Sequence, residues 1–320
     1  MQPDTLNSKN QIAIVISTYN GAKYIGQQLD AILHQTYPNW RCYIRDDGSS
    51  DNTIDILNEY AAKDSRICFL DDKKGNMGLN PSHYYLLSLP NENYIATCDQ
   101  DDVWHANKLE VSLKKIQEIE TEAKIPALVH TESLFVDSEL NVMRDKFIGD
   151  RGLRKGLNGI IFANSVQGGS ILLNKSLNDI SIKIPPKLPY DYHLGIIADL
   201  VGTRAFIPEA LLQYRQHSKS SIATSDAKSN TDQTDNKLSA TLRLSLNCYH
   251  HIKNDFNHVT TTNEAKKALT EYLYLFEGKS TLKKLFIAIK NFYPFYRKKD
   301  YLQFLLLILK KQNLINPENN

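Results

Sequence analysis

The 320-residue sequence predicts an α/β protein with a doubly wound, mostly parallel sheet of the Rossmann-like type and a C-terminal helical extension. Over the first half, apolar runs rich in β-branched residues alternate with segments of helical period, the order that builds a parallel sheet. Residues 218–237 are polar and nearly devoid of large apolar side chains, and after them only the helical period remains. We therefore expect a sheet domain over 1–217, a flexible polar loop over 218–237 and a helical region over 238–320.

The first four strand–helix units follow one another closely. Residues 11–17 are an uninterrupted apolar run, typical of a strand buried on both faces of a sheet. The helix that follows carries one apolar face, formed by Tyr24, Ile25, Leu29, Ile32 and Leu33. The same alternation predicts three more strands, over 41–47, 66–72 and 93–99, and three more helices, over 49–62, 80–90 and 105–122.

Beyond residue 126 the alternation is less regular. Residues 127–137 and 168–174 have the apolar character of strands, and residues 149–159 between them are rich in Gly and basic residues, as in a loop. Residues 203–217 predict a last pair of strands with a proline at the turn.

Composition excludes some classes of protein. Lys and Arg number 38 against 36 acidic residues, which argues against a dedicated nucleic-acid binder. The four cysteines are far apart and lie mostly in apolar stretches, so we interpret them as buried free thiols. The N-terminus shows no secretory signal, and no segment reaches the roughly 20 apolar residues of a membrane-spanning helix. The sequence therefore favours a cytoplasmic protein.

Acidic residues follow several strands at the point where each strand ends. Asp47 follows the second strand, and Asp99, Asp101 and Asp102 follow the fourth. Ligands of open α/β sheets bind at the carboxyl ends of the strands, where these side chains would meet. Asp99 and Asp101 would face the same way in an extended chain, and two carboxylates suit Mg2+ or Mn2+. Each motif alone fits a turn, a helix cap or core packing, but their convergence favours a binding site.

Four segments together resemble the family 2 glycosyltransferases of the GT-A fold: ISTYNGAKYIGQQLDAILHQTYPNW, IRDDGSSDNT, GNMGLN and CDQDDVWHANKLE. The DQDDVW form resembles the bacterial rhamnosyltransferase-like branch. The resemblance is close over 11–110 and looser to about residue 217.

The resemblance implies an inverting transfer of a sugar from a nucleoside-diphosphate-sugar to a saccharide or lipid-linked acceptor in bacterial surface polysaccharide synthesis. It favours thymidine-diphosphate-rhamnose as the donor and leaves uridine-diphosphate-hexoses open. The implied cofactor is Mn2+ or Mg2+, with Asp99, Asp101 and His217 as its ligands. The other implied site residues are Ser17, Tyr19, Asp47, Asn76 and Asp99 for the nucleotide, Gly168, Gly169 and Arg215 for the donor sugar and phosphates, and Asp191 as the catalytic base.

The sequence departs from the family's pattern at two places. The residue ahead of Asp191 is Tyr190, where an acid is common, and the segment NPSHYY lacks the Arg-Asn pair of many relatives. Trp104 has two open interpretations, a stacking wall for the acceptor sugar or a core residue.

The segment 281–311 mixes apolar stripes with Lys, Arg and aromatic residues. It predicts either a helical pair packed on the first domain or an amphipathic surface that lies on the inner leaflet of a membrane.

Three other functions were weighed. A haloacid-dehalogenase-type phosphatase would use DQDDV as its nucleophile motif, but that motif normally follows the first strand of its domain. A dinucleotide-dependent oxidoreductase would need a Gly-x-Gly-x-x-Gly turn after the first strand, which reads STYNGAKYIG here. A nucleotide-sugar-binding protein without catalysis stays open.

Overall fold

The structure, a computed structural model, describes residues 10–121, 124–146, 148, 156–162, 164–185, 187–217, 240–255, 261–291 and 298–309. The predicted polar loop over 218–237 lies outside these residues.

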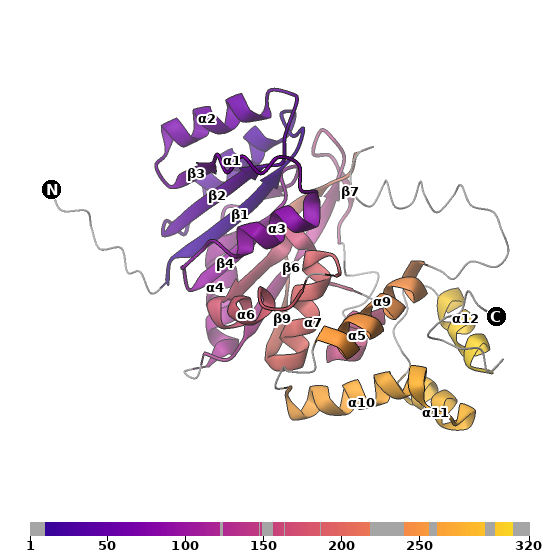
Figure 1. The fold of residues 1–320 in the computed structure, drawn as a ribbon. Helices are drawn as coiled ribbons and strands as arrows, with labels where there is room; N and C mark the ends of the chain where they lie inside the picture. Colours follow the sequence, from indigo (N-terminus) through magenta and orange to yellow (C-terminus); the bar gives the residue numbers. More distant parts are fainter. Residues whose placement is uncertain are drawn as a thin grey trace.

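One sheet organises the first 217 residues (Figure 1). Its strands are β1 (Ile12–Thr18), β2 (Trp40–Asp46), β3 (Ile67–Leu70), β4 (Tyr94–Cys98), β5 (Val103–Trp104), β6 (Ala127–Val136), β7 (Val142–Arg144), β8 (Ile171–Asn174) and β9 (Thr203–Arg215). The strand order is β3-β2-β1-β4-β8-β6-β9-β5, and β7 pairs with β6. The first four strands are parallel to one another, and β8 is antiparallel to both β4 and β6. Since β9 is parallel to β6, the ends of β1, β2, β4 and β9 meet at one edge of the sheet.

Helices cover both faces of this sheet, as predicted. They are α1 (Ile25–Leu33), α2 (Thr53–Lys63), α3 (Leu79–Leu87), α4 (Lys108–Glu120), α5 (Gly156–Phe162), α6 (Lys175–Ser181) and α7 (Tyr190–Val201). β1 sends Ile12, Ile14 and Ile16 into the core under α1, α2 and α4, and Ala13 and Val15 into the core under the other helices. This alternation explains the uninterrupted apolar run, because both faces of β1 are buried.

The segment 203–217 differs from its prediction. It contains one long strand, β9, instead of a strand pair, and pairs with β6 along its length. Thr131 of β6 faces Ile207 whereas Glu132 faces Ala210, so Pro208 and Glu209 form a bulge. A proline cannot donate to the sheet ladder, and a bulge accommodates it without ending the strand. The strand therefore continues to the edge where β4 ends.

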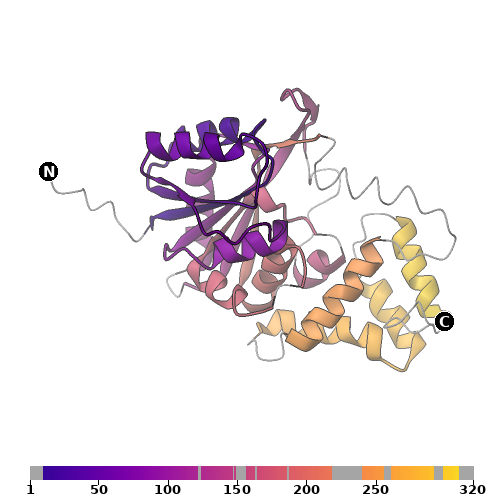
Figure 2. The ribbon, with the colours of Figure 1, turned by 45° about the horizontal axis from the view of Figure 1, so that its top comes forward.

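The C-terminal helical extension is confirmed. Its helices are α9 (Ala240–Asp255), α10 (Asn263–Glu277), α11 (Thr281–Asn291) and α12 (Lys298–Leu309), which Figure 2 shows grouped on one side of the sheet domain. Phe162 of α5 joins the two parts, with ring centroids 5.8 Å from those of both Tyr272 and Phe304. No helix of the described residues is long and apolar enough to cross a membrane. All four cysteines are free thiols, and only Cys68 is partly accessible.

Candidate active site

The four residues that follow β4, Asp99 to Asp102, form a turn at the carboxyl edge of the sheet, which we call the acidic turn. We expected an extended segment here, in which Asp99 and Asp101 would face the same way. Because the chain turns instead, strand alternation does not decide where these carboxylates point. Asp99 Oδ1 accepts a hydrogen bond from the Tyr190 hydroxyl at 3.0 Å. Asp101 Oδ2 lies 2.7 Å from His217 Nε2, so the structure brings together two of the three residues predicted as metal ligands.

Asp102 is fully buried, in contrast to Asp99 and Asp101, whose side chains are about one quarter exposed. Its Oδ1 accepts a hydrogen bond from the backbone N–H of Arg215 at 3.1 Å. Its Oδ2 has no hydrogen-bond partner among the described residues. The spacing of Asp102 in the sequence does not show that it is buried, so no role was predicted for it.

Arg215, predicted to neutralise phosphates, is held by the protein instead. Its guanidinium donates to the carbonyl of Asp101 at 2.7 Å and to Gln27 Oε1 at 2.6 Å, and it lies 4.5 Å from the centre of the Tyr24 ring. The residue is 1% exposed. These contacts correct the expected role: Arg215 holds the backbone of the acidic turn, and each of its three guanidinium nitrogens already donates a hydrogen bond to the protein.

The two glycines of the 3-10 helix η2 (Gly168–Ser170), predicted to lie beside the donor sugar, allow close approach of the protein's own side chains. A Cβ on Gly169 would lie 2.9 Å from Asp102 Oδ2 and 3.2 Å from Asp99 Oδ2. A Cβ on Gly168 would lie 2.0 Å from the Tyr190 hydroxyl. Any other residue would push against the groups that surround the acidic turn.

Trp104 belongs to the core. It is 3% exposed, its Nε1 donates to the Gly169 carbonyl at 3.2 Å, and Lys108 Nζ lies 4.0 Å from the centre of its ring. A sugar could not stack on this ring, so the acceptor-wall interpretation is wrong. Trp104 instead supports the η2 segment through its hydrogen bond to the Gly169 carbonyl.

Asp191, the predicted base, lies in the first turn of α7, directly after Tyr190, which contacts the acidic turn, and its charge acts on Asp99. Its Oδ2 accepts a hydrogen bond from Asn164 Nδ2 at 3.0 Å. Burial raises the pKa of Asp191 to about 6. A carboxylate with a raised pKa is a stronger base than an ordinary aspartate and is still ionised near pH 7.

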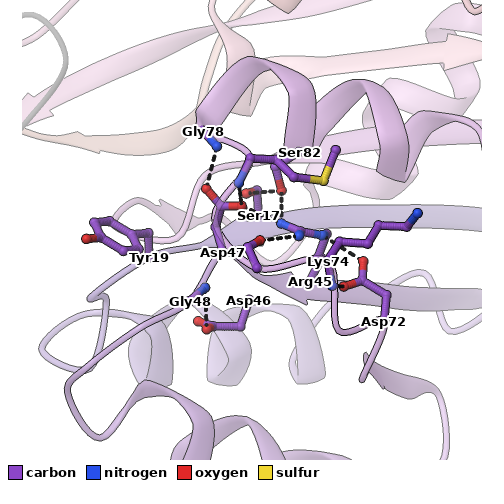
Figure 3. Close-up of polar contacts among 12 residues, drawn as sticks. Ser17, Tyr19, Arg45, Asp46, Asp47, Gly48, Asp72, Lys74, Gly78 and Ser82 are labelled. Carbon is purple, nitrogen blue, oxygen red and sulfur yellow. Dashed lines mark hydrogen bonds and ion pairs between the residues drawn. The ribbon is translucent and has the colours of Figure 1, made fainter.

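A second polar cluster lies at the ends of β1 and β2, and we call it the Arg45 cluster (Figure 3). The Arg45 guanidinium is fully buried and donates to Asp47, Asp72 and Ser82, at 2.5, 2.7 and 3.1 Å. Asp47 also accepts the backbone N–H groups of Met77 and Gly78, at 2.6 and 2.7 Å. Ser17 Oγ donates to Ser82 Oγ at 2.7 Å. The predicted residues Ser17 and Asp47 therefore lie in one connected network, organised by an arginine that the sequence analysis did not single out.

Tyr19 and Asn76 lie at the rim of the Arg45 cluster. The Tyr19 ring is half exposed and makes none of the hydrogen bonds drawn in Figure 3. Asn76 is exposed and close to Gly48. Gln100, which the sequence analysis missed, joins the two regions: its side-chain amide donates to the Tyr19 carbonyl at 3.1 Å and accepts from the Tyr19 N–H at 3.0 Å.

The acidic turn carries more negative charge than its hydrogen bonds satisfy. Burial, with the Asp101 charge nearby, raises the pKa of Asp99 to about 7, and burial raises the pKa of Asp102 well above its ordinary value. Among the described residues no three His, Cys, Asp or Glu side chains converge to form a complete metal site. The donor set still fits Mg2+ or Mn2+, which proteins commonly bind through one or two carboxylates together with substrate phosphates. Asp102 Oδ2 is buried and has no hydrogen-bond donor among the described residues, and a cation bound nearby would compensate for the missing donor.

Sequence comparison assigns the chain that carries this site to a family. Residues 13–172 match the sequence profile of "Glycosyl transferase family 2". An uncharacterized glycosyltransferase of Haemophilus influenzae is 23% identical over 323 residues, which cover 95% of this chain and 98% of the relative. An Escherichia coli UDP-Glc:alpha-D-GlcNAc-diphosphoundecaprenol beta-1,3-glucosyltransferase is 36% identical over 104 residues, covering 32% of this chain and 39% of the relative.

Solved structures share the fold. TarS of S. aureus (residues 1–349, with UDP-GlcNAc) superposes with a TM-score of 0.58 at 13% identity, covering 96% of this chain and 89% of that one. The mannosyltransferase PcManGT of Pyrobaculum calidifontis, with GDP-Man and Mn2+, has a TM-score of 0.57 at 14% identity, covering 94% and 86%. The chain belongs to glycosyl transferase family 2 and is a glycosyltransferase with the GT-A fold.

Proposed function

We propose that the protein is an inverting, metal-dependent glycosyltransferase in which Asp191 is the catalytic base and the acidic turn holds Mn2+ or Mg2+ beside the donor diphosphate. The family assignment supports transfer from a nucleotide-sugar and sets aside the phosphatase and oxidoreductase alternatives. The observation that carries the proposal is the proximity of a raised-pKa carboxylate, Asp191, to an acidic turn in which the pKa of Asp99 is also raised and Asp102 Oδ2 has no hydrogen-bond donor among the described residues.

In the proposed reaction, the acceptor hydroxyl oxygen attacks the anomeric carbon and its proton passes to Asp191. The bond between that carbon and the diphosphate oxygen breaks, and the nucleoside diphosphate leaves with the electron pair. Attack from the face opposite the diphosphate inverts the anomeric centre. Asp191 is suited to its role because Asn164 fixes its orientation and burial strengthens it as a base.

Asp99, Asp101 and His217 are the proposed ligands of the cation. When bound, the cation would supply positive charge to the departing diphosphate. Arg215 and Gln100 hold the backbone around these ligands, so the turn is preorganised before the cation arrives.

The donor is proposed to be thymidine-diphosphate-rhamnose, with a uridine-diphosphate-hexose as the second candidate. The resemblance to rhamnosyltransferases supports the first. The Escherichia coli relative, named for UDP-Glc, and TarS, crystallised with UDP-GlcNAc, support the second. In either case the half-exposed Tyr19 ring beside the Arg45 cluster is proposed to pack against the base, with Ser17, Asp47 and Asn76 near the nucleoside.

A thermal-shift screen tests this proposal, because a ligand that binds only the native state raises the melting temperature. We expect thymidine-diphosphate-rhamnose or a uridine-diphosphate-hexose, with Mn2+, to raise it by several degrees, and the same compounds with EDTA to raise it less. The absence of a shift with any nucleoside diphosphate or nucleotide-sugar would contradict the proposal.

The acceptor is proposed to be a saccharide or a lipid-linked saccharide, reached from the cytoplasmic surface of a membrane. The Escherichia coli relative, named for a diphosphoundecaprenol acceptor, supports this. So do two exposed apolar stripes at helical spacing on α11 and α12: Leu282, Phe286 and Ile289, and Leu302, Leu306 and Leu309, each more than half exposed. Residues 278–311 contain nine Lys or Arg and one acid, a charge that suits anionic headgroups.

Flotation with liposomes tests the membrane contact. We expect the protein to float with anionic vesicles and less with neutral ones, and the double variant Phe286→Glu/Leu306→Glu to remain in the soluble fraction. A matched variant on another surface, Ile54→Glu on α2, should float like the wild type. Equal partitioning of wild type and double variant would overturn the membrane proposal and leave the transfer reaction untouched.

A further inference from the structure

Tyr190 has an unusual position, directly before the proposed base and in contact with the acidic turn. It is the first residue of α7, and its hydroxyl donates to Asp99 Oδ1 at 3.0 Å. Its backbone N–H donates to Asn80 Oδ1 of α3 at 3.2 Å. One residue therefore joins the start of the helix that carries Asp191 to a carboxylate of the acidic turn.

The space around Tyr190 is shaped to hold its ring in one orientation. The residue is 4% exposed, and Gly168 leaves room for the hydroxyl where a Cβ would lie only 2.0 Å away. The ring stacks on His83, with centroids 4.1 Å apart and planes inclined by 7°. A parallel stack inside the protein restricts the ring more than loose apolar packing would.

His83 is the second member of this arrangement. It is 1% exposed, its Nδ1 lies 3.0 Å from the Leu79 carbonyl, and its Nε2 lies 4.0 Å from Asp99 Oδ1. It is carried by α3, whose neighbouring residue Ser82 belongs to the Arg45 cluster. The helix α3 therefore contacts the nucleotide side of the site through Ser82 and the acidic turn through the His83–Tyr190 stack.

Both residues lie where the sequence departs from the pattern of its family, ahead of Asp191 and within NPSHYY. The two departures are in contact with each other, and both face Asp99. An acid at position 190 would bring one more negative charge to a place already crowded with carboxylates. A phenol is neutral near pH 7 and donates a hydrogen bond to Asp99.

We propose that Tyr190 and His83 form a positioning pair: the stacked His83 ring orients Tyr190, whose hydroxyl holds Asp99 in place and fixes the start of α7 against the acidic turn. The inference rests on the proposed function for its catalytic meaning, since Asp99 is there a ligand of the cation and of the nucleotide. Neither residue touches the reacting atoms in this account.

The binding test uses Tyr190→Phe, which keeps the stacked ring and removes only the hydroxyl. In calorimetric titrations with UDP and Mn2+, we expect affinity to fall about tenfold, the effect of losing one hydrogen bond to a charged group. In steady-state kinetics the KM for the donor should rise by the same factor while kcat changes less than about threefold.

Tyr192→Phe is the matched control. Tyr192 is also buried in α7, and its hydroxyl donates to the Ile161 carbonyl, away from the acidic turn. Loss of the Tyr192 hydroxyl should lower the stability of the protein and leave its affinities for UDP and Mn2+ unchanged.

His83→Ala should lower the affinity for UDP with Mn2+, and His83→Phe, which restores a stacked ring, should recover most of that affinity. Equal affinities for Tyr190→Phe and wild type would overturn the pair.

A double-mutant cycle on the free protein gives a readout that needs neither metal nor activity. Unfolding in urea is compared for wild type, Tyr190→Phe, Asp99→Ala and the double variant. We expect the loss of the hydroxyl to shift the unfolding constant about tenfold in the wild type and hardly at all in Asp99→Ala. Additive effects would overturn the positioning pair, whereas a wild type that binds neither UDP nor thymidine diphosphate in the presence of Mn2+ would overturn the proposed function alone.

Discussion

The Arg45 cluster and the acidic turn both place aspartates at strand ends, yet their charges are treated in opposite ways. Asp47 accepts three hydrogen bonds from Arg45, Met77 and Gly78. Although burial alone raises the pKa of Asp72, donation from Lys74 N–H and Arg45 brings it below its ordinary value. In the acidic turn the pKa of Asp99 is raised to about 7, and Asp102 Oδ2 has no partner. The protein itself supplies the hydrogen-bond donors for the aspartates of the Arg45 cluster. In the acidic turn it supplies too little positive charge to compensate all of the carboxylates.

This difference separates aspartates whose charge the protein itself compensates from aspartates whose charge it leaves uncompensated, and sequence position alone does not show it. Carboxylates whose hydrogen bonds are satisfied stabilise the native state, whereas buried carboxylates without donors cost stability and are retained at sites that bind or react. Substitutions in and around the two regions test this contrast.

The largest effect is expected for Asp191→Asn. Removing the proposed base should lower kcat by about 10³-fold, within the range for general-base catalysis, while donor affinity should stay near the wild-type value because Asp191 is not proposed to hold the nucleotide. Steady-state transfer assays and UDP titration measure the two quantities. Asp55→Asn on the exposed face of α2 is the control and should behave as wild type. Transfer that survives in Asp191→Asn would mean that another residue is the base.

The stabilities of two variants should change in opposite directions. Asp47→Asn removes a carboxylate partner of buried Arg45 and should lower the free energy of unfolding by roughly 3 kcal/mol.

Asp191→Asn should instead raise the free energy of unfolding at pH 8. A carboxyl whose folded pKa is about 6 binds its proton more tightly when folded, so the wild type loses stability as pH rises from about 4 through 6.

The gain in Asp191→Asn should reach at most roughly 3 kcal/mol at pH 8 and shrink by about half at pH 5. Urea unfolding at the two pH values measures it. A loss of stability in both variants would contradict the contrast between Asp47, whose hydrogen bonds are satisfied, and Asp191, whose pKa is raised by burial.

The pH dependence of transfer should follow the base. Because burial raises the pKa of Asp191 to about 6, the fraction of ionised base falls about tenfold for each pH unit below that value. We expect kcat/KM at saturating Mn2+ to decline correspondingly on the acid side. A rate that stays constant from pH 7 to pH 5 would contradict a base with this pKa.

The smallest effect is expected for Gly169→Ala. The new methyl group would crowd Asp102 Oδ2 at 2.9 Å and Asp99 Oδ2 at 3.2 Å, and the turn would have to shift slightly. A loss of about tenfold in UDP affinity with Mn2+ is expected. Gly26→Ala, whose methyl would lie an ordinary 3.6 Å from the Tyr60 hydroxyl, is the matched control. Identical titrations for both variants would show that the approach to Gly169 is unimportant.

Much of the fold could be predicted because β1 and β4 are buried on both faces, which leaves short, mostly apolar runs in the sequence. The form of β9 could not, since the bulge at Pro208 depends on pairing with β6, more than 70 residues earlier. The same long-range pairing brings His217 to Asp101, which only the family resemblance suggested.

The site was predicted at the level of motifs and less well at the level of contacts. Aspartates at strand ends are visible in the sequence, but the commitment of Arg215 to the protein and the burial of Trp104 depend on neighbours from other segments. Gln100 and Tyr190 were missed as contact residues because each bonds to a residue more than 80 positions away. The residue type of a side chain can be read from the sequence, but its partner in the fold cannot be read from neighbouring positions.

The binding of a nucleoside diphosphate with and without Mn2+ tests the central claim most directly. Calorimetric titration of UDP and of thymidine diphosphate should show at least about tenfold tighter binding with Mn2+ than with EDTA, and Asp101→Asn should lose most of that difference. Equal affinities with Mn2+ and EDTA, or an undiminished Mn2+ effect in Asp101→Asn, would contradict the account of the acidic turn as a cation site.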